Sequence, residues 1–158
     1  MSNYILVKNN TIVNNILSDD TPITEDGVVA TLVSNWSASR NVGNVWNSVA
    51  NDYVPPFRLW NNSMEINSSE SVDFTFRFSN SIKNFPTNSF TFSDSEFASI
   101  NNINNMGDNV TVTIDTTMTS SSDILDIDID FSNVTNYYSQ SSEHSNISYT
   151  LTYDDLNS

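Results

Sequence analysis

The most constraining feature of the sequence is an unbroken alternation of apolar and polar residues over Val72–Phe78, VDFTFRF. Successive side chains of a β-strand point to opposite faces, so Val72 and the three phenylalanines would share one face. The intervening Asp, Thr and Arg would occupy the other face. Such a strand covers a core on one side and meets water on the other. The segment therefore predicts a half-buried antiparallel strand.

The same alternation recurs through the second part of the chain. Polar stretches rich in Asn and Ser separate the repeats, and these residues favour turns because their side chains compete for backbone hydrogen bonds. No segment repeats its apolar residues at the 3.6-residue period of a helix. Regularly spaced short strands of this kind predict an antiparallel β-sandwich. The further predicted strands are Ser89–Phe92, Val110–Ile114, Ile127–Phe131 and Ile147–Tyr153.

A smaller β-rich module precedes this sandwich. Two β-rich runs within Tyr4–Val13 flank the polar turn Lys8–Asn10, which predicts a hairpin. Further strands are predicted over Val28–Val33 and on both sides of a turn near Val49–Asp52. The Pro-Pro pair at 55–56 ends this pairing, because proline has no N–H to donate. The predicted fold class is therefore all-β, with an N-terminal β module over 1–56 and a sandwich domain over 57–158.

The composition excludes several classes of function. Five basic residues face 19 acidic ones, and the net charge of -14 repels nucleic-acid phosphates and anionic membranes. The absence of cysteine excludes disulfides, thiolate zinc sites and cysteine catalysis. Residues Met1–Ile5 lack the basic and apolar regions of a signal peptide. We therefore expect a protein that stays in the cytosol or leaves it within a particle released by lysis.

No residue pattern predicts catalysis, a cofactor or a metal. His144, the only histidine, lies in a Ser-rich segment without a nucleophile motif, and a solvated loop is the favoured interpretation. Asp126, Asp128 and Asp130 alternate with isoleucines, so a calcium site is the alternative to a solvated strand face. Their spacing of roughly 6.5 to 7 Å along one face favours the solvated face. That row of charge would also protect a sheet edge from other chains.

Aromatic residues gather near the proposed boundary at Pro56. Two interpretations stay open, because aromatic side chains are enriched both in small cores and in protein interfaces. The first is packing within the core or between the two modules, and the second is a partner interface. The candidate interface residues are Trp36, Trp46, Tyr53, Phe57 and Trp60.

The second part resembles bacterial immunoglobulin-like domains of surface adhesins and phage virion proteins. The resemblance lies in Val72–Phe85 (VDFTFRFSNSIKNF), Phe90–Ile103 (FTFSDSEFASINNI) and Tyr149–Asp154 (YTLTYD). It spans about Asn67 to Asp155 and implies an Ig-like sandwich. A Ser-rich segment over 139–145 replaces the glycine turn that usually precedes the last strand.

The first part resembles a short module of tailed-phage tail-fibre and accessory proteins. The matching pieces are Tyr4–Asn15 (YILVKNNTIVNN) and Val42–Pro56 (VGNVWNSVANDYVPP), with Ser48–Asn51 in place of the usual Asp-Gly turn. Together the two resemblances imply a non-enzymatic structural protein of the bacteriophage virion, assembled in the host cytoplasm. The first module would attach to the tail, baseplate, fibre or neck, and the Ig-like domain would be exposed.

Three other functions remain open at this stage. The first is a capsid decoration protein or head fibre, and the second is a carbohydrate-binding adhesin module. The third is a chaperone of fibre assembly. The expected partners are other phage structural proteins in a symmetric assembly, with host surface glycans as an additional possibility, and neither nucleic acid nor a membrane.

Overall fold

Strand β7, Ser71–Phe78, follows the predicted alternation at every position, with Val72, Phe74, Phe76 and Phe78 fully buried. The computed structural model of the chain describes residues 1–33, 41–142 and 146–158. The chain divides into two compact units, Met1–Pro56 (unit 1) and Phe57–Ser158 (unit 2). All named strand pairs are antiparallel, which confirms the predicted all-β fold class.

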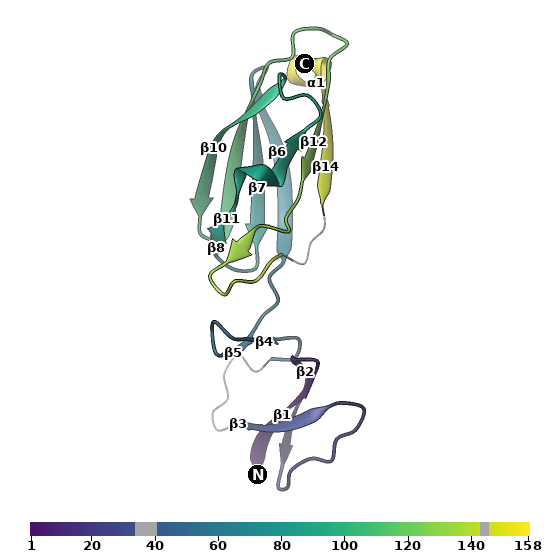
Figure 1. Ribbon diagram of the computed structural model, residues 1–158, viewed down its shortest axis with the longest axis vertical. Helices are drawn as coiled ribbons and strands as arrows, with labels where there is room; N and C mark the ends of the chain where they lie inside the picture. Colours follow the sequence, from purple (N-terminus) through teal and green to yellow (C-terminus); the bar gives the residue numbers. More distant parts are fainter. Residues whose placement is uncertain (34–40, 143–145) are drawn as a thin grey trace. The chain divides into compact units, whose positions relative to one another are not determined.

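Unit 1 is one five-stranded antiparallel sheet with the order β3-β1-β2-β4-β5 (Figure 1). Strand β2 pairs with β4 at Thr11↔Val45, and Ile12 exchanges backbone hydrogen bonds with Gly43 and Asn44. Beyond Ile12, this edge of β2 has no strand partner among the described residues. The strands are β1 Ser2–Lys8, β2 Thr11–Ser18, β3 Val29–Val33, β4 Val45–Asn47 and β5 Asp52–Val54.

The first hairpin closes where the sequence predicts it. Lys8 pairs with Thr11, and the two residues between them, Asn9 and Asn10, have φ values of 51° and 62°. Two consecutive positive φ angles are the property of a type I′ turn, whose twist matches that of the flanking strands. Asparagine tolerates this conformation better than most residues. The Asn-Asn pair therefore fixes the register of β1 against β2.

Unit 2 is a sandwich of two main sheets, ordered β10-β11-β7-β6 and β14-β12-β9. Lettered A to G in chain order, these seven strands form the sheets D-E-B-A and G-F-C, the arrangement of a constant-type immunoglobulin domain. A small pair, β13-β8, accompanies them. Besides β7, the elements are β6 Leu59–Ser68, β8 Ile82–Asn84, a 3-10 turn Thr87–Ser89, β9 Phe90–Phe92, β10 Ala98–Met106, β11 Asn109–Thr116, β12 Ile124–Ile129, β13 Thr135–Asn136, β14 Ile147–Thr152 and helix α1 Tyr153–Leu156.

One aromatic-rich core joins the two sheets of unit 2. The ring of Phe76 from β7 lies 5.4 Å from that of Phe131, which follows β12. The ring of Phe74 lies 5.0 Å from that of Tyr149 on β14. These edge-to-face contacts stabilise the core beyond the contribution of the apolar area that the rings bury. The alternating faces of β7, β11 and β12 thus form a single core, as the sequence pattern predicts.

The final predicted strand ends one residue early. Strand β14 stops at Thr152, and Tyr153 begins helix α1. The Thr152 side chain accepts a hydrogen bond from the Asp155 N–H, and the Asp155 carboxylate accepts one from the Thr152 N–H. This reciprocal capping satisfies two donors that a helix start leaves open. It explains why the alternating pattern over Ile147–Tyr153 does not continue as strand.

Substitution of Gly107 by alanine is expected to destabilise unit 2 by about 1–2 kcal/mol. Gly107 occupies the β10–β11 turn with φ at 84°, and an added Cβ would meet only the Ser81 hydroxyl, at 3.8 Å. The cost therefore comes from backbone strain and not from a clash. Urea unfolding of Gly107→Ala measures it, with Asp108→Ala as the neighbouring control. Equal urea midpoints for Gly107→Ala and wild type would contradict the expected backbone strain of the variant.

Candidate functional site

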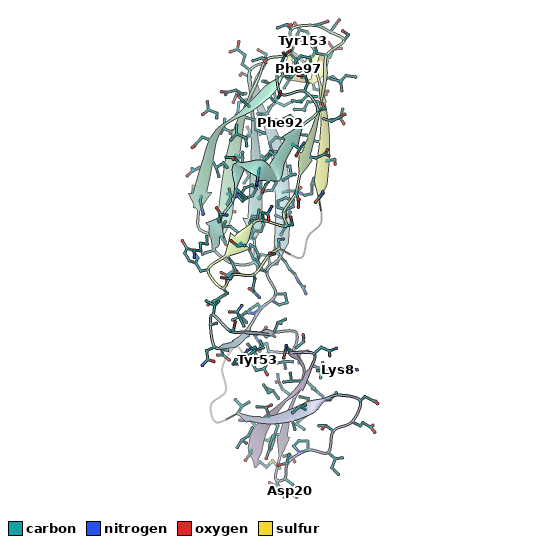
Figure 2. All side chains as sticks on the ribbon, viewed as in Figure 1. Lys8, Asp20, Tyr53, Phe92, Phe97 and Tyr153 are labelled. Atoms are coloured by element: carbon teal, nitrogen blue, oxygen red, sulfur yellow. The ribbon has the colours of Figure 1, made fainter. Side chains whose placement is uncertain are left out.

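The structure gives the five candidate aromatic residues different environments. Trp46 and Tyr53 are cross-strand partners on β4 and β5, with ring centroids 5.3 Å apart in an edge-to-face arrangement. Trp46 is 41% exposed, whereas Tyr53 is half-buried against the small core of unit 1 (Figure 2). The predicted pair of strands on both sides of a turn near Val49–Asp52 is confirmed, and the two aromatic residues lie on its opposite arms. Trp36 lies outside the described residues.

Phe57 and Trp60 belong to unit 2 and differ sharply in exposure. Phe57 is 1% exposed and stacks on Phe78 with a centroid distance of 5.3 Å. It is therefore a core residue, as the first of the two interpretations holds, and a partner cannot reach its ring. Trp60 is 62% exposed on edge strand β6, with the Arg77 guanidinium 5.7 Å from its ring centroid. This cation–π contact covers part of the indole. Of the four described candidates, two therefore belong to unit 1 and two to unit 2, and in unit 2 only Trp60 is exposed.

Exposed apolar side chains are concentrated in unit 1. Single exposed hydrophobic residues are ordinary on a protein surface, but a dense set in a small unit is informative. Unit 1 has 56 residues and unit 2 has 102, yet unit 1 carries the larger set. The exposed large hydrophobic residues of unit 1 are Met1, Val13, Leu17, Ile23, Val29, Leu32, Val42, Trp46 and Val49, and those of unit 2 are Trp60, Ile66, Met106, Ile124 and Tyr137.

Strand β1 is apolar on both faces of the sheet over its run Tyr4–Val7. Ile5 faces a core cluster of only three buried residues, completed by Ile12 and Val33. On the opposite face, Tyr4 pairs with Leu32 of β3 and with Ile16 of β2. An antiparallel sheet with one solvated face would carry polar residues there. Here an apolar row crosses three strands and ends at Leu32, which is 61% exposed.

The two strands that flank β1 also have unpaired edges. Strand β3 is the outermost strand of the sheet, and its sequence VATLV has neither a charge nor a proline. The second half of β2 carries Leu17, 59% exposed, beside a shallow hollow of about 280 Å³ that Asn3, Asn15 and Ile16 also line. Natural proteins usually blunt free edges with charges, prolines or bulges. We call the exposed apolar side chains of these strands, Val13, Leu17, Val29 and Leu32, the apolar surface of unit 1. Leu32 lies on the Tyr4 face of the sheet, whereas Leu17 and Val29 lie on the Ile5 face, so this surface extends around both edges.

The aspartate row on β12 does not have the edge-protecting role that the sequence pattern indicates. That prediction is wrong, because β12 is the central strand of its sheet and pairs with both β14 and β9. Asp126 accepts a hydrogen bond of 2.7 Å from the Thr150 hydroxyl, and Asp128 accepts one from the Ser148 hydroxyl. Cross-strand hydroxyls therefore satisfy both carboxylates on the outer face of the sheet.

Asp130 makes a local hydrogen bond that leads to a prediction of pH dependence. The Ser132 N–H donates to its carboxylate at 2.9 Å, and this bond, with one from the Ser132 hydroxyl, lowers the pKa of Asp130 below 3.8. A lowered folded-state pKa stabilises the fold above the ordinary carboxyl pKa, and this contribution is lost as the pH falls through the lowered value. We expect Asp130→Asn to be less stable than wild type at neutral pH, with a difference that shrinks in acid.

Urea midpoints of the two proteins at neutral and at acidic pH check this expectation. Asp20→Asn, which removes an exposed loop carboxylate from unit 1, is the control for the change in net charge. A difference between Asp130→Asn and wild type that grows on acidification would refute the assigned hydrogen bond.

Other candidate chemistry receives no support from the described residues. No three His, Asp or Glu side chains among them are grouped so that they could hold a metal ion. His144 falls in the gap at 143–145, outside the described residues. In the described parts of the chain, no helix has the length and apolar character needed to cross a membrane.

The apolar surface of unit 1 was not predicted as a site from the sequence, although a signal was present. Tyr4–Val7 does not alternate, in contrast to Val72–Phe78. A continuous apolar run indicates a strand that is covered on both faces. The continuous apolar run of unit 1 and the alternating run of unit 2 therefore distinguish the two units more clearly than the positions of the aromatic residues do.

The chain was also compared with known proteins. No protein-family model, no curated protein sequence and no solved structure matches it.

Proposed function

We propose that this chain is a non-enzymatic structural protein of a bacteriophage virion. Unit 1 attaches it to the tail, baseplate, fibre or neck, and unit 2 is exposed as an Ig-like domain. The observation that carries the proposal is the uneven distribution of apolar surface. Unit 1 buries a cluster of three residues and exposes the apolar surface defined above, whereas the core cluster of unit 2 has twenty buried residues in the described part.

The edges of unit 1 favour attachment through its strands. An extended segment of a partner can add to an unpaired edge, where backbone hydrogen bonds supply affinity and side-chain pockets supply specificity. Both β3 and the second half of β2 offer such an edge, next to Leu32 and Leu17 respectively. A partner strand on either edge would cover apolar side chains and pair open backbone groups at the same time.

Unit 2 has the opposite surface character, which supports exposure to solvent. It carries fourteen of the nineteen acidic residues and three of the five basic residues. Net charge of one sign keeps a protein soluble and discourages self-association at high copy number. The outward side of β7 and β11 is polar, with a hydrogen bond of 2.7 Å from Thr113 to Asp73. Such a surface suits a domain that stays solvated on a crowded particle.

The two resemblances support the virion as the location of the protein. The pieces Tyr4–Asn15 and Val42–Pro56 resemble the short module of tailed-phage accessory proteins, and their strands β1, β2, β4 and β5 lie in one sheet. The Ig-like resemblance concerns unit 2, whose strand order is that of a constant-type domain. We therefore place the attachment function in unit 1 and the exposed function in unit 2.

Quantitative mass spectrometry of purified phage particles tests the proposal. We expect this chain at a fixed stoichiometry to the major capsid protein, in multiples of three or six for a tail or neck ring. A copy number that matches the capsid lattice would instead identify a decoration protein or head fibre. Absence from finished particles would refute the proposal and favour the assembly chaperone.

A further inference from the structure

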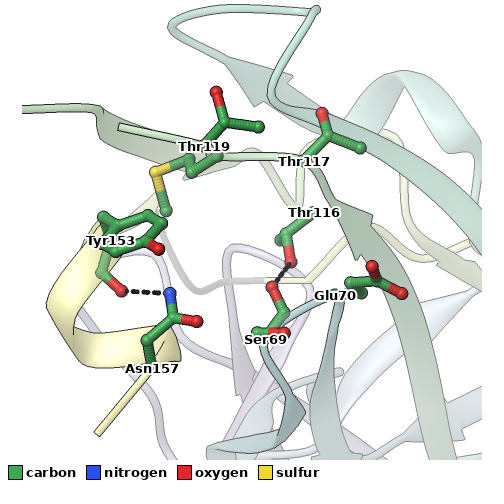
Figure 3. A pocket seen from close by; sticks show the side chains of 8 residues that line it. Ser69, Glu70, Thr116, Thr117, Thr119, Tyr153 and Asn157 are labelled. Carbon is green, nitrogen blue, oxygen red and sulfur yellow. Dashed lines mark hydrogen bonds between the residues drawn. The ribbon is translucent and has the colours of Figure 1, made fainter. Parts of the chain in front are cut away.

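A polar hollow lies at one end of unit 2, remote from the first residues of β6. Three segments that are distant in sequence line it: the β6–β7 turn, the segment after β11, and α1 with the residue that follows it (Figure 3). Its volume is about 430 Å³, within the range of roughly 300–1,000 Å³ that is typical of small-molecule pockets. The lining residues used below are Ser69, Glu70, Thr116, Tyr153 and Asn157.

Hydrogen bonds fix the walls of this hollow. Thr116 is fully buried, its hydroxyl donates to the Ser69 carbonyl at 3.1 Å, and its N–H donates to the Glu70 carbonyl at 2.9 Å. On the helix side, the Asn157 amide donates to the Tyr153 carbonyl at 2.7 Å. Leu156, 5% exposed, anchors α1 in the core. A site held in this way loses little conformational freedom when a ligand binds.

The lining groups that these hydrogen bonds do not use determine which ligands the hollow can bind. The Glu70 carboxylate and the Tyr153 hydroxyl lie on opposite sides of the hollow (Figure 3) and make no hydrogen bond among the described residues. Asn157 keeps its carbonyl oxygen available, because its bond to Tyr153 uses the Nδ2 group. Hydroxyl, carboxylate and amide groups together offer donors and several acceptors. They match a ligand whose own hydroxyl groups both donate and accept.

The same lining excludes other ligand classes. No Lys or Arg lines the hollow, so an anionic ligand would meet Glu70 without a counter-charge. Glu70 is the only lining residue with a carboxylate, too few ligands for a bare metal ion. The ring of Tyr153 supplies an apolar face beside these polar groups. We infer that the hollow binds a neutral saccharide, with the Tyr153 ring against the C–H groups of the sugar and Glu70 accepting from its hydroxyls.

This inference concerns unit 2 alone and does not depend on the attachment proposed for unit 1. Screening the full-length chain on a glycan microarray of neutral and acidic saccharides tests it, followed by calorimetric titration of the best ligand. We expect a neutral saccharide to bind, with an affinity that Glu70→Gln and Asn157→Ala each reduce about tenfold. Tyr153→Phe keeps the ring and tests the hydroxyl separately. Glu65→Gln, an exposed glutamate of β6 outside the hollow, should leave the affinity unchanged.

Three results would overturn the inference. The first is the absence of binding to any saccharide at millimolar concentration. The second is a preference for acidic saccharides, which the charge of the hollow forbids. The third is an affinity that Trp60→Ala abolishes and the Glu70 and Asn157 variants leave intact, because the ligand would then bind at the exposed indole of β6.

Discussion

Replacing Phe76 with alanine should destabilise unit 2 by about 3–5 kcal/mol, the range for large-to-small aromatic substitutions in a core. Phe76 is fully buried, and its ring lies 5.5 Å from that of Phe85 and 5.4 Å from that of Phe131. The substitution removes both contacts and leaves a cavity that β7, paired on both sides, cannot close. Urea unfolding of the full-length chain measures the loss.

The matched control for this substitution is Tyr137→Ala, which removes an aromatic ring that is 61% exposed in the same unit. Exposed side chains away from special features change the free energy of unfolding by less than about 0.5 kcal/mol. If Phe76→Ala cost no more than the control, the aromatic cluster would not be the main source of stability in unit 2.

The second large effect is expected in unit 1, where Leu32→Asp should reduce attachment to the particle about a hundredfold. The substitution places a charge at the end of the apolar row that Tyr4 and Ile16 complete, so docking would have to desolvate that charge. Leu32 is 61% exposed in the free chain, and its replacement should therefore leave folding intact. The amount of chain retained on purified particles measures the effect.

Ile124→Asp provides the matched control for the attachment assay. Ile124 begins β12 in unit 2 and is 55% exposed, so the substitution makes the same chemical change at a similar exposure. We expect this variant to be retained like wild type. Loss of Ile124→Asp from particles together with retention of Leu32→Asp would assign attachment to unit 2.

Local patterns explain why most of the fold could be predicted. The alternation over Val72–Phe78 specifies both a strand and its buried face, and β7 has that face in the core. Asn9 and Asn10 specify a turn whose conformation few other residues accept. In each case the information lies within a few consecutive residues, so no knowledge of the partner strands is needed.

Strands whose pattern is set by distant partners were not predicted. Strand β6, LWNNSMEINS, is mostly exposed and carries two irregularities in its pairing with β7, so its alternation is interrupted. Strand β10, ASINNINNM, has the same character at the opposite edge of the sheet and contains one bulge. Edge strands bury little, and their hydrophobic signal is correspondingly weak. Their place in the sandwich depends on β7 and β11.

The candidate sites also depend on contacts between distant parts of the chain, which the local sequence does not specify. Phe57 and Trp60 are three positions apart, yet Phe57 precedes β6 and packs on Phe78 in the core, whereas Trp60 lies exposed on the edge strand itself. The polar hollow of unit 2 draws its lining from around residues 70, 117 and 153, which only the completed sandwich brings together. The sequence shows which side chains have the chemistry to bind a ligand or a partner. The fold determines which of these side chains lie next to one another.

The central claim, attachment through unit 1 with unit 2 exposed, is tested most directly by hydroxyl-radical footprinting of the chain on purified particles and free in solution. The account predicts protection of Leu17, Val29 and Leu32 on the particle, with Ile124 and Tyr137 labelled equally in both states. Protection of Ile124 and Tyr137 with continued labelling of the three unit 1 residues would contradict it.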